Sequence, residues 1–283
     1  MTTVPRHEVN SDAAAKVVEA LAAKNADDID RIETDPGALK SIFRRGLKLT
    51  RYRTVLDPTA AEAVTWLELR IAAQAGTALL RAAAGEGEID AVVARPVRFP
   101  ATGPTSYANA GTWLTVTWLA VIDRNDTLLR QLAAIPLDAL RASGAEHDAY
   151  LYPWVETVQN FLVNREVTAE LFGTVMDGTD PDTVQRTAPE VMLRLIYPPI
   201  EMFYHLLRRD SGKFTDSLAR AAEQHRRFWT GNRELAADPG GFVALAPLAV
   251  AVLARSAGMT VDVESGYLPA NFLRGTHRQA MMT

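Results

Sequence analysis

Hydrophobic residues recur three and four positions apart along most of this chain, with polar residues between them. That spacing places the hydrophobic side chains on one face of an α-helix. In the first third it predicts a helix capped by Ser11, a second opened by Asp35-Pro36 and a third opened by Asp57-Pro58. The third helix is expected to end at Gly85, in the left-handed conformation.

The segment 88–99 does not follow the helical pattern. Ile89, Val93 and Phe99 favour β-strands, and Pro96 and Pro100 oppose a helix. The sequence therefore predicts a short extended excursion, such as a small hairpin, within a helical chain.

Two pairs of helices with a charged elbow follow. One helix, from about 106 to 123, ends at Arg124-Asn125-Asp126, and another, from 191 to 207, ends at Arg208-Arg209-Asp210-Ser211. A second helix with one apolar face follows each elbow, which is typical of antiparallel helical hairpins. We therefore predict an all-α fold of stacked antiparallel helical hairpins, an irregular tetratricopeptide-like array without a strict repeat of about 34 residues.

The C-terminal third carries further local signals. Pro198-Pro199 is expected to break or strongly kink its helix, because proline lacks an amide hydrogen and clashes with the preceding turn. The stretch 242–254 has no polar face and predicts a central buried helix. Residues 261–269 are expected to be extended or turn structure, and 275–283 are expected to fray.

Composition places the chain among globular proteins, with 48% hydrophobic and 23% charged residues. With 283 residues it can bury a sizeable core, and we predict one helical domain over 1–283, or two packed halves of about 1–165 and 166–283. The 30 Lys and Arg residues against 34 Asp and Glu give a net charge of -4, which argues against nucleic acid as the main partner. The apolar stretch 242–254 is too short to span a membrane and residues 1–11 lack a signal-peptide pattern, so we expect a cytoplasmic protein.

The sequence contains no recognisable catalytic pattern. It has no cysteine, which excludes thiolate nucleophiles and sulfur-bound zinc, and it has neither a G-x-S-x-G turn nor a Gly-rich phosphate loop. His147-Asp148 resembles the His-Asp pair of helical metal phosphohydrolases, but Asp148 is more simply a helix N-cap, and His205 and His225 lack acidic neighbours in register. We predict no catalytic residue, no metal and no cofactor, and keep a helical metal-dependent hydrolase around His147, Asp148 and Tyr152 as an alternative.

Aromatic residues offer the first candidates for binding. Trp113 and Trp118 lie on the apolar face of their helix and are predicted to be core residues. Four polar residues lie near helix starts, where they can satisfy free backbone groups or line a groove: Tyr107, Asn109, Tyr150 and Tyr152.

An acidic run provides a second candidate: Asp27, Asp28, Asp30, Glu33 and Asp35. Its simplest interpretation is the solvated end of a helix and the following loop. Its functional interpretation is a docking patch for a basic partner, because complementary charge speeds association and selects partners.

Longer stretches of this chain resemble a known family. Ala101–Ala120 reads ATGPTSYANAGTWLTVTWLA, and Ile135–Gln159 reads IPLDALRASGAEHDAYLYPWVETVQ. Together with LIYPPI (195–200), HRRFW (225–229) and VESGYLP (263–269), these segments are similar to the immunity protein 49 family of actinobacteria. The resemblance extends from about His7 to Leu273.

The resemblance implies an immunity protein of a polymorphic toxin system, which protects its producer by binding a cognate protein toxin. It also implies an all-helical fold without enzymatic activity. It carries over no toxin-contacting residues, and Tyr107, Asn109 and Trp113 have an architectural interpretation as well. The alternative within binding proteins is a helical scaffold for other proteins or peptides; the sequence predicts no oligomeric state.

Overall fold

Helices form most of this protein, and the computed structural model describes residues 2–276. The first part of the chain contains β1 (Thr2–Val4), α1 (Ser11–Arg31), α2 (Ala38–Leu56), α3 (Ala63–Ala84), β2 (Glu88–Val93), β3 (Arg95–Pro100), α4 (Ala110–Ile122), α5 (Asp126–Ala133), α6 (Leu137–Arg141) and α7 (Leu151–Asn164). The rest contains α8 (Ala169–Asp177), α9 (Pro189–Val191), a π-helical segment (Met192–Ile196), α10 (Tyr197–Leu207), α11 (Ser211–Trp229), α12 (Arg233–Ala237), a 3₁₀ turn (Pro239–Gly241), α13 (Leu245–Ser256), β4 (Val263–Ser265) and α14 (Ala270–Arg274).

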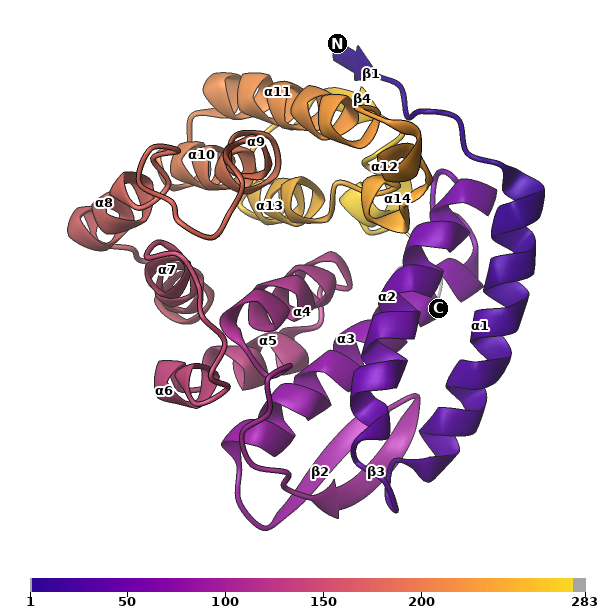
Figure 1. The fold of residues 1–283 in the computed structure, drawn as a ribbon. Coiled ribbons are helices and arrows are strands. Elements are labelled where there is room, and N and C mark those ends of the chain that lie inside the picture. Colours follow the sequence, from indigo (N-terminus) through magenta and orange to yellow (C-terminus); the bar gives the residue numbers. More distant parts are fainter. Residues whose placement is uncertain (1, 277–283) are drawn as a thin grey trace.

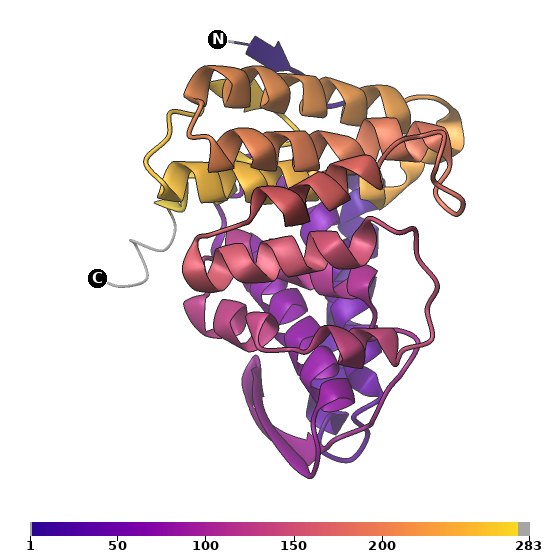
Figure 2. The ribbon, with the colours of Figure 1, turned by 90° about the vertical axis from the view of Figure 1, so that its left-hand side faces the viewer.

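Successive helices pack against one another and form the stack that Figure 1 shows. The helices α1, α2 and α3 lie along one side, α4 packs on α3, and α10 packs on α11. In the view turned by 90°, α7, α10 and α11 run as nearly parallel rods at successive levels (Figure 2). The predicted all-α fold of helical hairpins with an extended excursion at 88–99 is confirmed.

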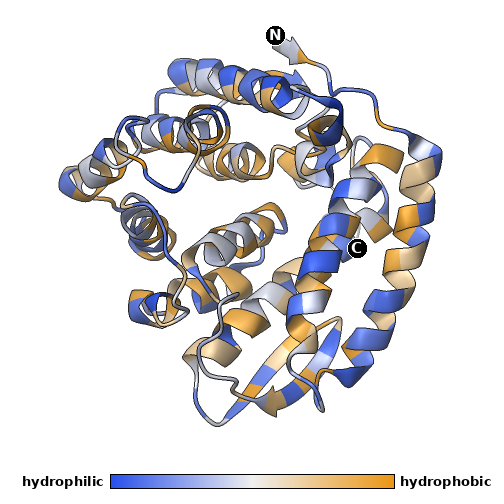
Figure 3. Cartoon of the chain, viewed as in Figure 1, coloured by the Kyte–Doolittle hydropathy of each residue, from blue (hydrophilic) through white to orange (hydrophobic). Residues whose placement is uncertain are grey.

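The helix α13 occupies the centre of the C-terminal part. It contacts α4, α10, α11 and α14, and every residue from Pro247 to Ala254 is buried. By length and composition the 18 residues of Pro239–Ser256 could cross a membrane, but 67% of that stretch is buried inside the fold, as in the core helix of a globular protein. Hydrophilic residues instead lie on the outer faces of helices such as α1 and α11 (Figure 3).

The two ends of the described chain are joined. Strand β1 pairs in parallel with β4, with Thr3 opposite Glu264, and the two lie side by side in Figure 1. The His7 ring lies 2.9 Å from the Tyr267 hydroxyl through Nδ1 and 3.0 Å from the Ala236 carbonyl through Nε2. The sequence predicted an extended segment at 261–269 but not its partner strand.

Several helix ends differ from the predictions. The helices α2 and α3 begin at Ala38 and Ala63, after the predicted Asp35-Pro36 and Asp57-Pro58 pairs, and Asp57 accepts the Ala61 and Glu62 amides ahead of α3. Asn10, one residue before Ser11, caps α1 by accepting the Ala13 amide at 2.9 Å. Gly85 is extended (φ -96°) rather than left-handed, and the left-handed residue is Gly87, where the chain turns into β2. The expected fraying of 275–283 lies mostly outside the described residues, although Gly275 ends α14 in the left-handed conformation.

The helix is not broken at Pro198-Pro199, so that part of the prediction is wrong, and the alternative of a strong kink stays a prediction. The chain stays helical from Pro189 to Leu207, because residues 192–196 widen into a π-helix immediately before the prolines. The Tyr197 amide bonds to the Met192 carbonyl, five residues back. A π-turn shifts the carbonyls that the prolines would otherwise obstruct, so a local change of register replaces the break.

Close packing of α2, α3 and α4 depends on a glycine. A Cβ built at Gly76 would overlap the Val116 side chain and lie 3.0 Å from Phe43. Gly173, on α8, has no atom within 4 Å of the same position. Both glycines lie in helices, but only Gly76 lies at a contact between helices.

We therefore expect Gly76→Ala and Gly173→Ala to have opposite effects on the free energy of unfolding. Alanine favours a helix over glycine by about 0.5–1 kcal/mol, so Gly173→Ala should stabilise. Gly76→Ala should destabilise by about 1–3 kcal/mol because the added methyl overpacks the core. Urea denaturation measures both, and equal stabilisation by the two substitutions would contradict the described packing.

A buried histidine makes stability depend on pH. The His225 Nε2 atom lies 3.0 Å from the Gly241 carbonyl, so the neutral ring carries its proton there. Burial lowers the pKa of His225 to about 3, although the bond to Gly241 opposes the shift. In the unfolded chain the His225 ring has a pKa near 6.5. It therefore takes up a proton at pH values at which the same ring in the folded chain stays neutral.

The contribution of the neutral His225 ring to the free energy of unfolding is therefore complete above about pH 6.5 and is lost as the pH falls towards 3. Between pH 6 and 4 the free energy of unfolding should fall by up to about 1.4 kcal/mol per pH unit from this group. His225→Gln should remove that part of the slope, whatever its effect on absolute stability. An unchanged slope in chemical denaturation across this range would show that His225 is not buried as a neutral ring.

Candidate functional site

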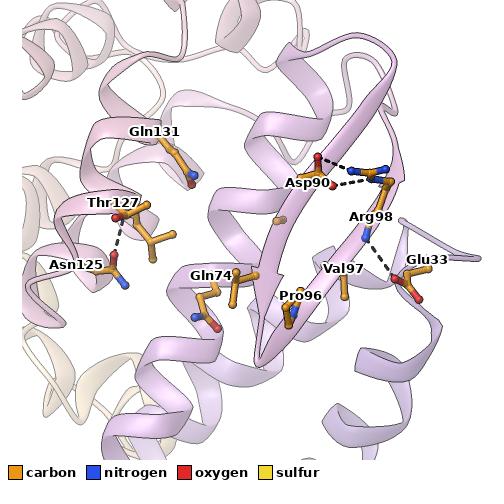
Figure 4. A pocket seen from close by; sticks show the side chains of 12 residues that line it. Glu33, Gln74, Asp90, Pro96, Val97, Arg98, Asn125, Thr127 and Gln131 are labelled. Atoms are coloured by element: carbon orange, nitrogen blue, oxygen red, sulfur yellow. Dashed lines mark hydrogen bonds and ion pairs between the residues drawn. The ribbon is translucent and has the colours of Figure 1, made fainter. Parts of the chain in front are cut away.

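A surface groove lies between the β2–β3 hairpin and the helices α3 and α5 (Figure 4). Its hollow has a volume of about 690 Å³. The lining residues come from the end of α1, from α3, from both strands and from the α4–α5 region: Glu33, Gln74, Asp90, Ala91, Val92, Pro96, Val97, Arg98, Asn125, Thr127, Leu128 and Gln131.

The hairpin has a buried face and an exposed face, as alternation along its strands dictates. Ile89, Val93 and Phe99 are buried in the main core. On the other face, Val92 is 51% exposed. Arg98 Nε and Nη2 donate to the two carboxylate oxygens of Asp90 at 2.6 and 3.0 Å, a cross-strand pair that fixes the register.

The two edges of this hairpin are not equivalent. The Ala101 amide donates to the Gly87 carbonyl at 2.7 Å, which makes 87/101 a hydrogen-bonded pair. Hydrogen-bonded and non-bonded pairs alternate in an antiparallel ladder, so 88/100, 90/98 and 92/96 are non-bonded pairs whose backbone groups point outward. On β3 these outward positions are Pro96, Arg98 and Pro100.

The β3 edge is closed. Pro96 and Pro100 have no amide hydrogen, and the Arg98 amide donates to Glu33 Oε1 at 3.4 Å. On β2, the Asp90 carbonyl accepts Arg81 Nη1 at 2.8 Å. The outward amides of Asp90 and Val92 have no bonding partner within the described chain.

The opposite wall, α5, is held by the elbow before it. Arg70 Nη2 donates to Asp123 Oδ1 at 3.0 Å, and Asn125 Oδ1 accepts the Leu128 amide at 3.2 Å. Arg124 donates to the carbonyls of Phe272 and Leu273 at 3.0 and 2.9 Å, which ties the elbow to the C-terminal end of α14. The predicted elbow at 124–126 is confirmed, and Asn125 caps the helix that follows it.

The acidic run is divided by the structure. Asp28 is buried and pairs with Arg31 and Arg45, and the Asp35 carboxylate accepts the Gly37 amide at 3.0 Å. Glu33 lines the groove and lies 3.7 Å from Arg95. The remaining members, Asp27 and Asp30, are exposed.

The predicted polar aromatic candidates lie at the starts of two different helices, away from the lining of the groove. Before α4, Lys40 Nζ lies 3.2 Å from the centre of the Tyr107 ring, and Asn109 caps the helix by accepting the Thr112 amide at 3.0 Å. Before α7, Tyr150 is only 5% exposed, and burial raises its pKa to about 12. Tyr152 is half-buried, with the Arg141 guanidinium 4.7 Å from its ring.

The predicted role of Asp148 as a helix N-cap is wrong. Its carboxylate reaches instead across to the loop at 185–187 and accepts four hydrogen bonds of 2.6–2.9 Å, from the amides of Gln185, Arg186 and Thr187 and from the Thr187 hydroxyl. Tyr150, at the N-cap of α7, makes no side-chain capping bond. Because its oxygens are engaged, Asp148 is poorly placed to act as a base or metal ligand.

The described part of the chain has no obvious metal site. Among residues 2–276, no group of three or more His, Asp or Glu side chains is arranged to hold an ion. Trp113 and Trp118 are buried, as predicted, and Trp113 Nε1 donates to the Leu132 carbonyl at 2.9 Å.

A second hollow, of about 230 Å³, lies where α7, α10 and α13 end. Apolar side chains such as Phe161, Leu206 and Leu253 line it, together with Arg165 and Arg209. Both arginines adopt left-handed backbone conformations at elbows between helices. This site is smaller than the groove and cationic, so it suits a different kind of partner.

Comparison with known proteins gives one match. A family model described as Immunity protein 49 matches residues 57–272, which include the hairpin, α3 to α13 and most of α14 but not the acidic run. No curated protein and no solved structure matches the chain.

Removing the Asp148 carboxylate should release the loop it holds. We expect Asp148→Ala to lower the free energy of unfolding by about 2–3 kcal/mol, because buried amides lose their acceptor. Hydrogen bonds lower the pKa of Asp148 to about 2 against the opposing effect of burial, so its contribution persists above pH 4 and is lost as the pH falls towards 2.

Amide exchange at 185–187, together with urea denaturation, tests this role. Asp148→Asn keeps the shape and one acceptor oxygen and should cost less than alanine. Unchanged exchange at these three amides in Asp148→Ala would contradict the assignment.

Proposed function

The chain belongs to the immunity protein 49 family, and we propose that it binds a cognate polymorphic toxin in the cytoplasm and neutralises it by steric occlusion. The observation that carries this proposal is the extent of the family match, which covers residues 57–272. The match includes all strands and helices that form the groove apart from the end of α1.

Occlusion needs a stable surface rather than a reactive group. A specific complex buries roughly 800 Å² on each partner, and a few anchoring contacts supply most of the affinity. A dissociation constant of about 1 nM corresponds to about -12 kcal/mol. A rigid helical body favours such affinity because little conformational entropy is lost when it binds.

The chemistry of the described residues supports occlusion over modification of the toxin. The alternative hydrolase site would need His147 and Asp148 to bind a metal, yet Asp148 holds the 185–187 loop. His147 belongs instead to a small aromatic contact, with its ring centre 5.9 Å from that of Tyr152.

Expression of the toxin encoded beside this gene tests the proposal. Cells producing the toxin should grow when they also produce this chain, and the two proteins should elute together in a 1:1 complex. An unrelated toxin in the same host should remain lethal, because recognition depends on a matched surface.

Absence of both rescue and complex would refute the proposal. Tight binding to unrelated host proteins or peptides, without rescue, would favour a helical scaffold instead.

A further inference from the structure

We propose that the open edge of β2 receives an extended basic segment of the toxin, which pairs with β2 as a third strand. This inference rests on the proposed function, since it assigns the toxin a specific contact. It assigns recognition to backbone hydrogen bonds, with side chains on the rim of the groove selecting the partner.

The two edges of the hairpin differ in their capacity to pair with a further strand. Pro96, Pro100 and the bond from the Arg98 amide to Glu33 close the β3 edge to a further strand. The β2 edge has no proline, and although Arg81 donates to the Asp90 carbonyl, the outward amides of Asp90 and Val92 have no acceptor among residues 2–276. Exposed strand edges are usually protected, so protection of one edge alone marks the other as available for pairing.

The groove provides space beside the β2 edge. Figure 4 shows Asp90 of β2 on the side towards Gln131 and Thr127, and Arg98 of β3 on the side towards Glu33. The hollow between the hairpin and α5 has a volume of about 690 Å³. A paired strand lies roughly 4.8 Å from its neighbour, and five residues extend about 17 Å. The Gln74 oxygen already accepts the Ala94 amide at 2.9 Å, so its NH₂ group and the side-chain amide of Gln131 are the groups of the lining that can hydrogen-bond the outer side of an added strand.

The charged side chains near β2 favour a basic partner. The arginines of the hairpin are already engaged: Arg98 by the Asp90 carboxylate, Arg95 by Glu33, and nearby Arg81 by the Asp90 carbonyl. Glu86 and Glu88, at the start of β2, are exposed and form no ion pair within the described chain. Asp126, at the start of α5, is likewise exposed and without an ion pair there.

These charges define the occupant. A strand carrying Lys or Arg would meet Glu88, which begins the strand that it pairs with, and complementary charge would speed its association. The exposed Val92 side chain offers an apolar contact for a residue opposite it. The occupant is therefore an extended segment with basic residues and at least one apolar residue.

Proline at position 92 provides a selective test. The Val92 amide points away from β3, so Val92→Pro removes an outward donor without removing a bond of the hairpin. Its cross-strand neighbour, Pro96, already shows that the matching position accepts proline. Val92→Ala is the matched control, since it shortens the same side chain and keeps the amide.

We expect Val92→Pro to bind the purified toxin at least tenfold more weakly than Val92→Ala, by calorimetry at 150 mM salt. In the wild-type complex, amide exchange at Asp90 and Val92 should slow at least tenfold, whereas exchange at Arg98, which already has a partner, should change little. Glu88→Arg should weaken binding at low salt and reduce its salt dependence. This exposed substitution and the wild-type exchange data decide the question if the proline variant does not fold.

The outcomes separate the two proposals. If the wild-type chain binds and neutralises the toxin while Val92→Pro binds as tightly as Val92→Ala and β2 gains no protection, the strand inference is wrong and the proposed function stands. Protection at Phe161, Arg165 and Arg209 instead would place the contact in the hollow at the ends of α7, α10 and α13. If the wild-type chain neither binds the toxin nor rescues cells, the proposed function fails and the inference fails with it.

Discussion

The fold depends on the burial of α13, a helix without a polar face. Leu248, Ala249 and Val250 project about 100° apart around its axis, and all are buried. Such a helix must be covered on every side, and α4, α10, α11 and α14 supply that cover. A helix from the end of the chain therefore lies against one from its middle. The bonds from Arg124 to the end of α14 follow from this return and hold the elbow that positions α5.

Local signals in the sequence predicted most of the helices. The apolar spacing and the charged elbows at 124–126 and 208–210 mark helix pairs, since Asn125 and Asp210 each cap the helix that follows. Features that join distant segments were not predictable in the same way. The pairing of β1 with β4 and the reach of Asp148 to 185–187 bring together residues far apart in sequence. The π-helix before Pro198 lets the helix continue through the two prolines, and the presence of proline alone does not predict it.

The candidate site was predictable only in part. The extended excursion and the nearby acidic residues were visible in the sequence, and Glu33 lines the groove. Tyr150, by contrast, is buried, and the aromatic candidates divide between two helix starts. A stronger signal was available in Pro96 and Pro100, which occupy alternate positions of one strand while its partner has no proline. That asymmetry indicates which edge of the hairpin is closed. The position of α5 opposite the open edge could not be predicted from the sequence.

The central claim is that protection results from one molecule covering another. A titration of a fixed amount of active toxin with this protein tests that claim most directly. The account predicts that residual toxin activity falls linearly to zero at one equivalent, does not change with incubation time, and returns in full when the proteins are separated by denaturation and the toxin is refolded. Progressive inactivation of excess toxin by a small fraction of an equivalent, with permanent chemical change in the toxin, would contradict it.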